Sequence, residues 1–300
     1  MHILTGTASW TDPTLLACGR FYPRDVRTPE ARLRYYATQF NLLEVDATYY
    51  RLPDARAAHA WAQRTPEDFA FHVKAHRLFT GHPAPTQDLP GDIQQELAGQ
   101  TKLFYHQLPR ELQEELWRRF LIALEPLRLA GKLHAIHFQF APWIQRGARG
   151  MALLRECQRY MDEHVMSVEF RHRSWFSTKT ASAWTLDVLR EANMVHTVVD
   201  APKGFDNTVP ALWDATHPDL AVVRLHGRNA DAWGNNTGAS SGRFQYEYSP
   251  EELAELAQSI KRLAERVRNT HVVLNTNYQD QGMRNAAGLA AALRNTPALP

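Results

Sequence analysis

Short apolar segments alternate with longer segments of helical periodicity along most of this chain. The pattern predicts eight strands, at residues 3–9, 42–47, 70–75, 133–140, 165–170, 195–200, 220–225 and 272–274. It predicts helices between and after them, at residues 29–40, 54–64, 109–131, 151–161, 181–191, 250–266 and 282–293. Strands that alternate with helices are typical of a parallel sheet, because each helix returns the chain to the start of the next strand.

Eight strands with helical crossovers is the count that a closed (β/α)8 TIM barrel requires. The chain has 300 residues, and such a barrel typically takes about 250 residues as one domain. We therefore predict an α/β fold with a single TIM-barrel domain over residues 1–300.

The connection at residues 79–108 is unlike the others, because prolines and glycines interrupt its short polar segments. A connection of this length is usually functional or mobile. It follows the third strand and should emerge at the carboxyl ends of the strands. A lid over the pocket and an excursion packed on the barrel flank are the two interpretations.

Most of the predicted strands end in polar side chains at alternate positions. Residues i and i+2 of a strand share a face, so each strand presents these groups to one side at its carboxyl end. TIM barrels have their active sites at that end. From this pattern we predict Glu44, Asp46, Glu169 and His226 as catalytic residues. We predict as substrate-binding residues Lys74, Gln139, Arg171, Arg224, Arg228, Asn275 and Asn277.

Glu44 and Asp46 form the first chemical candidate. Two carboxylates this close raise one another's pKa and separate into an acid and a base, or bind a divalent cation together. The alternative is a structural salt bridge with Arg51 or Lys74. Lys74 itself is either an anchor for an anion or a Schiff-base nucleophile.

Glu169 and the arginines form the second candidate. Glu169 would act as a general acid or base and Arg171 would bind an anion, although a buried Glu beside an Arg is often simply a paired charge. Arg224 and Arg228 flank His226, which titrates near neutral pH, and arginines bind phosphate bidentately. The alternative is that the arginines neutralise the glutamates. The loop at residues 234–242 is a weak candidate for phosphate binding.

Aromatic residues follow several strand ends and should surround the mouth of the barrel, where they would stack on nucleobases or sugar faces. They are Trp10, Tyr49, Tyr50, Trp143, Trp175, Trp233 and Tyr278. We predict Trp10, Tyr49 and Trp175 as substrate-binding residues. The alternative for each ring is packing of a loop against the barrel.

Composition and charge limit the classes of partner that the protein could bind. The net charge of +2 and pI of about 8.5 give no global field for polyanions, so any nucleic acid contact must be local. No apolar segment approaches the roughly 20 residues of a membrane span, the first residues do not resemble a signal peptide, and two cysteines fit a reducing cytosol. We expect a cytoplasmic protein with no membrane partner.

No cofactor is predicted. Fourteen histidines occur without an HExxH or CxxC motif, so a divalent metal would need a site assembled from several strands. Glu44, His137, Glu169 and His226 are the residues that would form it.

An ordered set of motifs along almost the whole chain resembles the YecE-like family, domain of unknown function 72. The motifs are Gly6-Thr7-Ala8-Ser9-Trp10, Phe21-Tyr22-Pro23, Glu44-Val45-Asp46-Ala47-Thr48-Tyr49-Tyr50, Phe71-His72-Val73-Lys74-Ala75, Phe138-Gln139-Phe140, Glu169-Phe170-Arg171-His172, Arg224-Leu225-His226-Gly227-Arg228 and Asn285-Ala286. The resemblance implies a TIM barrel and no established activity, so it transfers no catalytic role.

Three functions fit these residues. The leading hypothesis is a hydrolase, lyase or isomerase that acts by acid/base chemistry on a small anionic or polyhydroxylated substrate, such as a phosphosugar or nucleotide fragment. The second is a binding module for nucleic acid or a metabolite. The third, a metal-dependent nuclease or isomerase, rests on fold analogy alone. The oligomeric state is beyond the sequence.

Overall fold

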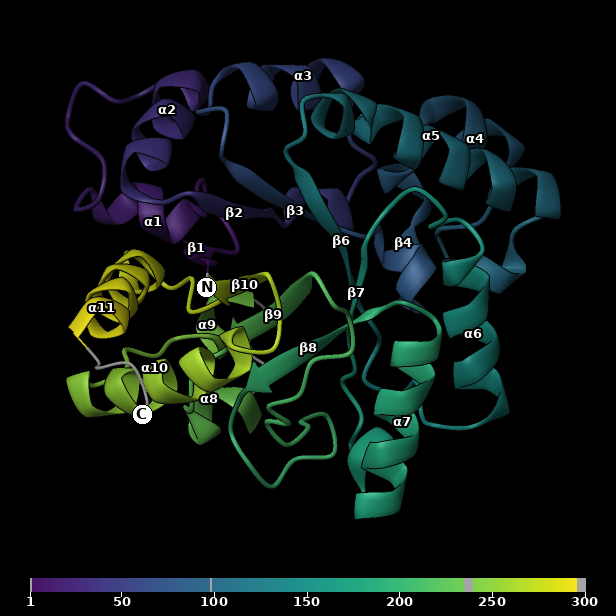
Figure 1. The fold of residues 1–300 in the computed structure, drawn as a ribbon. Helices are drawn as coiled ribbons and strands as arrows, with labels where there is room; N and C mark the ends of the chain where they lie inside the picture. The colour runs from purple at the N-terminus through teal and green to yellow at the C-terminus, as the bar shows by residue number, and fades with distance from the viewer. Residues whose placement is uncertain (1, 98, 235–239, 296–300) are drawn as a thin grey trace.

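A closed barrel of eight parallel strands forms the centre of the computed structural model, which describes residues 2–97, 99–234 and 240–295 (Figure 1). The strand order around the barrel is β1-β10-β9-β8-β7-β6-β3-β2. These strands are β1 (His2–Thr7), β2 (Leu42–Val45), β3 (Ala70–Lys74), β6 (Leu133–Gln139), β7 (Met166–Glu169), β8 (Val195–Asp200), β9 (Leu220–Leu225) and β10 (Asn269–Leu274). The predicted (β/α)8 TIM barrel is therefore confirmed.

Helices surround the barrel and cover the outer faces of its strands (Figure 1). The longer ones are α2 (Pro29–Gln39), α3 (Ala55–Gln63), α5 (Arg110–Leu129), α6 (Ala148–Gln158), α7 (Lys179–Glu191), α10 (Pro250–Ala264) and α11 (Gln281–Asn295). The shorter ones are α1 (Pro13–Cys18), α4 (Gly91–Glu96), α8 (Ala230–Gly234) and α9 (Ser240–Arg243). No helix in the described ranges is long and apolar enough to cross a membrane.

The start of β10 differs from the sequence prediction, which began this strand at residue 272. In the structure β10 begins at Asn269 and pairs with β1 and β9 from that residue onward. Its first three residues, Asn269, Thr270 and His271, are polar, so they carry no apolar signal. They belong to the strand because their backbones pair with β1 and β9, and His271 meets His72 inside the barrel.

The barrel interior is unusually rich in buried histidine. His72, His137 and His271 are all completely buried, on three different strands. His72 Nε2 lies 2.9 Å from His271 Nδ1, and His137 Nδ1 lies 3.0 Å from the Ser167 hydroxyl. Apolar residues next to polar ones in β2 and β3, such as Val45 and Val73, belong instead to the main hydrophobic core. This alternation places the polar residues of β2, β3 and β6 inside the barrel.

The connection after β3 folds into η2 (Arg77–Thr80), β4 (Ala84–Pro85), η3 (Thr86–Asp88), α4, β5 (Lys102–Leu103) and η4 (Tyr105–Gln107). Strands β4 and β5 pair as a small antiparallel sheet. Phe79 stacks on Trp117 of α5 at 3.7 Å between ring centroids, and Asp92 pairs with Arg119 of α5. These contacts attach the connection to α5 on the barrel flank, and its residues Gly81 and His82 lie near the mouth described below.

Candidate active site at the carboxyl ends of the strands

A cavity of about 440 Å³, here named the mouth cavity, opens where the strands end. Its lining combines three cationic side chains, one carboxylate, four amides and several rings: Lys74, Arg171 and Arg243, then Asp46, then Gln139, Asn207, Asn275 and Asn277, then Tyr49, Tyr50, His82, Trp143 and Phe244, with Pro142. Lys74 is the last residue of β3 and Gln139 the last of β6, while Asn275 directly follows β10. The mouth cavity therefore lies where TIM barrels have their active sites.

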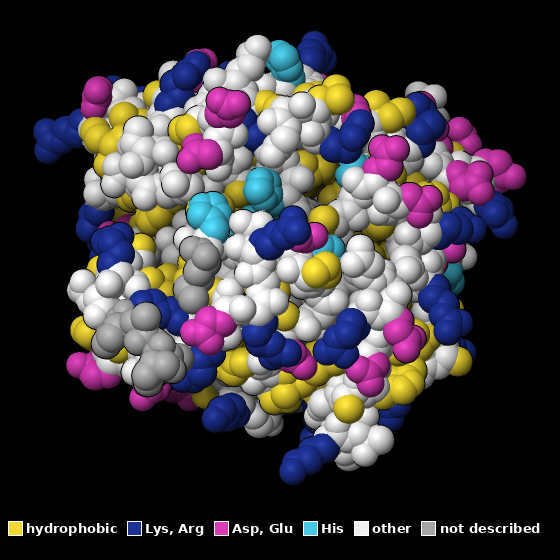
Figure 2. Space-filling view, viewed as in Figure 1, with side chains coloured by type: hydrophobic (Ala, Val, Ile, Leu, Met, Phe, Trp, Pro, Cys, Tyr) yellow, Lys and Arg dark blue, Asp and Glu magenta, His cyan; other side chains and the backbone are white. Residues whose placement is uncertain are grey.

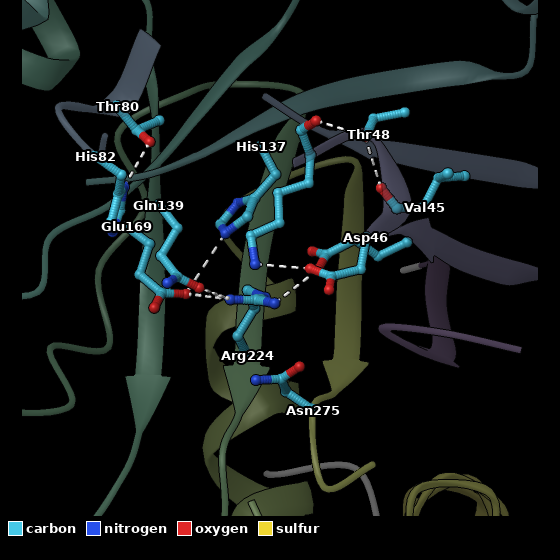
Figure 3. A network of polar contacts seen from close by, with 12 residues as sticks. Val45, Asp46, Thr48, Thr80, His82, His137, Gln139, Glu169, Arg224 and Asn275 are labelled. Carbon is cyan, nitrogen blue, oxygen red and sulfur yellow. Dashed lines mark hydrogen bonds and ion pairs between the residues drawn. The ribbon is translucent and has the colours of Figure 1, made fainter. Parts of the chain in front are cut away.

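Arg224 forms the floor of the site and joins opposite sides of the barrel (Figure 3). One guanidinium nitrogen donates to Glu44 Oε1 at 2.6 Å. The other terminal nitrogen donates to Glu169 Oε2 at 2.7 Å and to Gln139 Oε1 at 3.1 Å. Arg224, Glu44 and Glu169 are completely buried, so each charge depends on the others for compensation.

Glu169 is surrounded by donors. Besides Arg224, Arg171 donates to its Oε1 at 3.1 Å, and His226 Nε2 lies 3.0 Å from the same oxygen. Burial acts to raise the pKa of Glu169, but His226, Arg224 and these hydrogen bonds hold it well below the usual range. Glu169 is thus a fixed carboxylate at neutral pH and a poor proton carrier, and its predicted catalytic role has no support in the geometry.

His226 links Glu169 to the mouth cavity through Asn275. Burial lowers the pKa of His226 to about 4, although Glu169 acts to raise it, so the ring is neutral at pH 7. A neutral ring beside a carboxylate donates from Nε2, and its Nδ1 then accepts from Asn275 Nδ2 at 2.8 Å. The series Glu169–His226–Asn275 therefore fixes the orientation of an amide that lines the cavity.

Lys74 and Asp46 form a charged pair within the cavity wall. Lys74 Nζ donates to Asp46 Oδ1 at 2.6 Å. Burial acts to lower the pKa of Lys74, but the Asp46 carboxylate raises it overall, so Lys74 is an ammonium at neutral pH. The Thr48 hydroxyl donates to the Lys74 carbonyl at 2.6 Å and holds the turn after β2 over β3. A protonated Lys74 fits an anion anchor rather than a Schiff-base nucleophile.

The expected carboxylate pair of Glu44 and Asp46 does not form a shared site. Glu44 bonds to Arg224 and Asp46 bonds to Lys74. Of the two, Asp46 lines the mouth cavity, whereas Glu44 lies beneath it. Strand β2 ends at Val45, so Asp46 already belongs to the turn and leaves the alternation that placed it beside Glu44.

The structure corrects the prediction that Arg228 binds the substrate. Its guanidinium binds both carboxylate oxygens of Asp200 at 3.0 Å and also Glu252 at 3.0 Å, and it does not line the mouth cavity. Gly227 has a φ of 83°, a left-handed conformation that ends the alternation after His226. Arg228 therefore turns away from the face that Arg224 and His226 share.

Two of the three predicted aromatic binding residues lie elsewhere. Trp10 is buried and packs edge-on against Trp61 at 6.2 Å. Trp175 is buried against Phe170 at 3.9 Å, and its indole nitrogen donates to the Ile144 carbonyl at 2.8 Å. Both rings fix loops against the barrel, so the expectation that they surround the mouth is wrong.

The third of those residues, Tyr49, lines the mouth cavity, as do Tyr50 and Trp143. Trp233 does not line the mouth cavity, but it contacts two residues that do: Arg171 lies over its ring at 4.9 Å, and its indole nitrogen donates to Asn207 Oδ1 at 2.9 Å. The glycine-rich candidate at residues 234–242 is only partly described, since residues 235–239 lie outside the described residues.

Among the residues that the structure describes, no three His, Cys, Asp or Glu side chains are arranged to hold a metal ion. The described residues therefore offer no candidate metal site. The set considered from the sequence was Glu44, His137, Glu169 and His226. In the structure Arg224 donates to both of its carboxylates. A guanidinium therefore occupies the place between them that a cation would need.

Comparison with known proteins identifies the family. Residues 4–300 match the sequence profile of the family described as "Protein of unknown function DUF72". The chain belongs to the DUF72 family. This confirms the resemblance drawn from the motifs.

Relatives of this DUF72 protein share both its length and its fold. It is 30% identical over 278 residues to the UPF0759 protein YunF of Bacillus subtilis (strain 168), covering 92% of this chain and 89% of that one. Crystal structures of two DUF72 family proteins have the same fold. One, from Enterococcus faecalis V583, has a TM-score of 0.80 and 23% identity, covering 99% of this chain and 98% of that chain. The other, from Thermotoga maritima MSB8, has a TM-score of 0.77 and 26% identity, covering 98% and 100%.

Besides Pro142, four residues that line the mouth cavity escaped the sequence analysis: His82, Asn207, Arg243 and Phe244. They come from the connections after β3, β8 and β9, where no periodic pattern marks a position as inward. His82 stands between Gly81 and Pro83, which signals only a turn. Loop residues reach a site through tertiary packing, so strand alternation could not reveal them.

Proposed function

We propose that this DUF72 protein is an enzyme that binds a small anionic, hydroxylated molecule in the mouth cavity, such as a phosphosugar or a nucleotide fragment. The observation that carries the proposal is the charge of the lining. Lys74, Arg171 and Arg243 face the cavity with a single carboxylate, Asp46. When the floor of Arg224, Glu44 and Glu169 is included, the site keeps one positive charge in excess.

The amides of the lining support a hydroxylated ligand. An amide offers both a donor and an acceptor, which is what a hydroxyl group requires. Asn277 Oδ1 is buried and has no hydrogen-bond partner among the described residues, so a ligand hydroxyl would satisfy it. Asn275 is held in one orientation by His226.

Proton transfer is assigned to Asp46. Of the four residues predicted as catalytic, Asp46 lines the cavity, whereas Glu44, Glu169 and His226 are buried beneath it. Its side chain keeps 23% of its surface exposed, so a substrate can reach it. Lys74 at 2.6 Å would stabilise negative charge that develops on the substrate.

The test is a panel of phosphosugars and nucleoside monophosphates, followed by calorimetry for binding and by NMR for turnover. Asp46→Asn should lower the kcat of any turnover found by about 10²-fold or more, with affinity changed only a few-fold. Unchanged turnover in Asp46→Asn would exclude its acid/base role. If no compound of the panel binds the wild type, the proposal as a whole is wrong.

The second candidate function is ligand binding without a chemical reaction. It is favoured because the Glu169 carboxylate already accepts several hydrogen bonds from the protein. Arg224, Arg171 and His226 already donate to this carboxylate, which is completely buried. Ligand affinity without turnover of any compound in the panel would support this candidate.

For a nucleic acid ligand, the logarithm of affinity should fall steeply with the logarithm of salt concentration. The face in Figure 2 does not favour such a polyanion, because cationic and anionic side chains are interspersed on it. A shallow salt dependence would therefore agree with a small ligand in the mouth cavity.

A further inference from the structure

A row of aromatic rings forms one wall of the mouth cavity. Tyr50 contacts Tyr49 edge to face at 5.0 Å, Tyr49 contacts His82 at 5.3 Å, and His82 contacts Trp143 at 5.5 Å. Burial lowers the pKa of His82 to about 3, so its ring is neutral and packs as an aromatic. Lys74 Nζ lies 4.6 Å from the centre of the Tyr49 ring, so the row contacts the anion anchor.

Trp143 ends this row and is the junction with a second hollow, here named the side groove. The indole is 52% exposed, yet its nitrogen donates to the Gly81 carbonyl at 3.2 Å, which fixes the ring. The side groove has a volume of about 1000 Å³ and is also lined by Phe104, Ile144 and Leu153. Trp143 lines both hollows, so they adjoin at this ring.

The side groove suits a flat apolar group better than a sugar. A sugar needs hydrogen-bond partners around its ring, whereas a nucleobase presents a π face to any aromatic platform. Arg146 and Arg149 line the groove, with Glu156 as its carboxylate, so its charge is compatible with an anionic ligand. A large exposed ring held in one position beside a polar cavity is typical of a binding surface.

We infer that the ligand is a nucleoside phosphate, with its base stacked on Trp143 in the side groove and its phosphate against Lys74 and Arg171. This inference rests on the proposed function, since it names the ligand of the same site. It selects a nucleotide over a phosphosugar, because only the nucleotide uses both hollows at once.

Calorimetry with adenosine 5′-monophosphate, ribose 5-phosphate and adenosine tests the inference. On the wild type, the monophosphate should bind about tenfold more tightly than ribose 5-phosphate, as expected for one stacked base. Trp143→Ala should weaken binding of the monophosphate about fivefold more than binding of ribose 5-phosphate, so that the preference falls to about twofold or less. Trp143→Phe keeps a ring and should retain most of the preference.

Leu129→Ala is the control, because it removes a 73% exposed apolar side chain that lines neither hollow. It should leave all three affinities unchanged. Equal affinity of the wild type for the monophosphate and ribose 5-phosphate, or a preference that survives Trp143→Ala, would overturn the inference and leave the proposed function intact. If neither phosphate compound binds, the proposed function fails, and the inference fails with it.

Discussion

Arg224 compensates two carboxylates that have no contact with solvent, Glu44 and Glu169. Removal of one member of such a group leaves charges buried without a partner, which is more costly than the pair was worth. The stability of the barrel mouth and the geometry of the site therefore depend on the same side chain.

We expect Arg224→Met to lower the free energy of unfolding by about 3–5 kcal/mol, measured by urea denaturation at pH 7. Arg110→Met is the control: Arg110 pairs with Glu114 at the surface, where the side chains are 73% and 52% exposed, so the loss should be about 1 kcal/mol or less. Equal losses in the two variants would contradict the conclusion that Arg224 compensates the buried carboxylates.

At this scale the sequence predicted which side chains face the barrel interior but not how they pair. The alternation of Glu44, Lys74, Glu169, Arg224 and His226 placed all five at the carboxyl ends of strands. Whether the carboxylates would be free or neutralised was left open, because pairing depends on strand order and distance across the barrel. Those quantities exist only in the closed structure.

Helix α10 shows how much local sequence can determine. Ser249 Oγ accepts from the Glu252 backbone nitrogen at 3.2 Å, and Glu252 Oε2 accepts from the Ser249 nitrogen at 2.9 Å. This is a capping box, and it depends on four consecutive residues alone. Local motifs of this kind can be predicted because no distant residue takes part.

Ser249→Ala should lower the free energy of unfolding by about 1 kcal/mol, because the cap loses its acceptor. Ser259→Ala, within the same helix, provides the control and should have no effect or a slight stabilising one, since alanine is the better helix former. Chemical denaturation of both variants measures the difference. A loss in Ser259→Ala as large as that in Ser249→Ala would argue against the cap.

The connection at residues 79–108 shows the opposite case. Its place on the flank depends on the stacking of Phe79 on Trp117 and of Trp117 on Tyr160, residues far apart in the chain. Nothing in the local sequence specifies such contacts, so the sequence left both a lid and a flank excursion open.

For the molecule as a whole, the buried histidines predict a loss of stability in mild acid. Burial lowers the pKa of His271 to about 3 and that of His196 to about 4. In the unfolded chain histidine binds a proton near pH 6.5. Below that pH the unfolded state binds more protons than the folded state. The stabilisation is therefore complete above pH 6.5 and is lost progressively as the pH falls toward 4.

His196→Gln tests this direction of the pH dependence of stability. Urea denaturation between pH 7.5 and 5 should show a pH slope that is shallower than that of the wild type by up to about 1.4 kcal/mol per pH unit below 6.5. His59→Gln, which removes an exposed histidine, serves as the control and should keep the wild-type slope. A wild-type slope in His196→Gln would contradict the linkage.

The central claim is that the mouth cavity is an anion site anchored by Lys74. The direct measurement is calorimetric titration of inorganic phosphate into the wild type, Lys74→Met and Arg228→Gln, with folding of each variant checked by circular dichroism. Arg228 comes from the same barrel end but pairs with Asp200 and Glu252 outside the cavity. We predict binding to the wild type and to Arg228→Gln, and affinity at least about tenfold weaker in Lys74→Met. No binding to the wild type, or equal affinity in Lys74→Met, would contradict the claim.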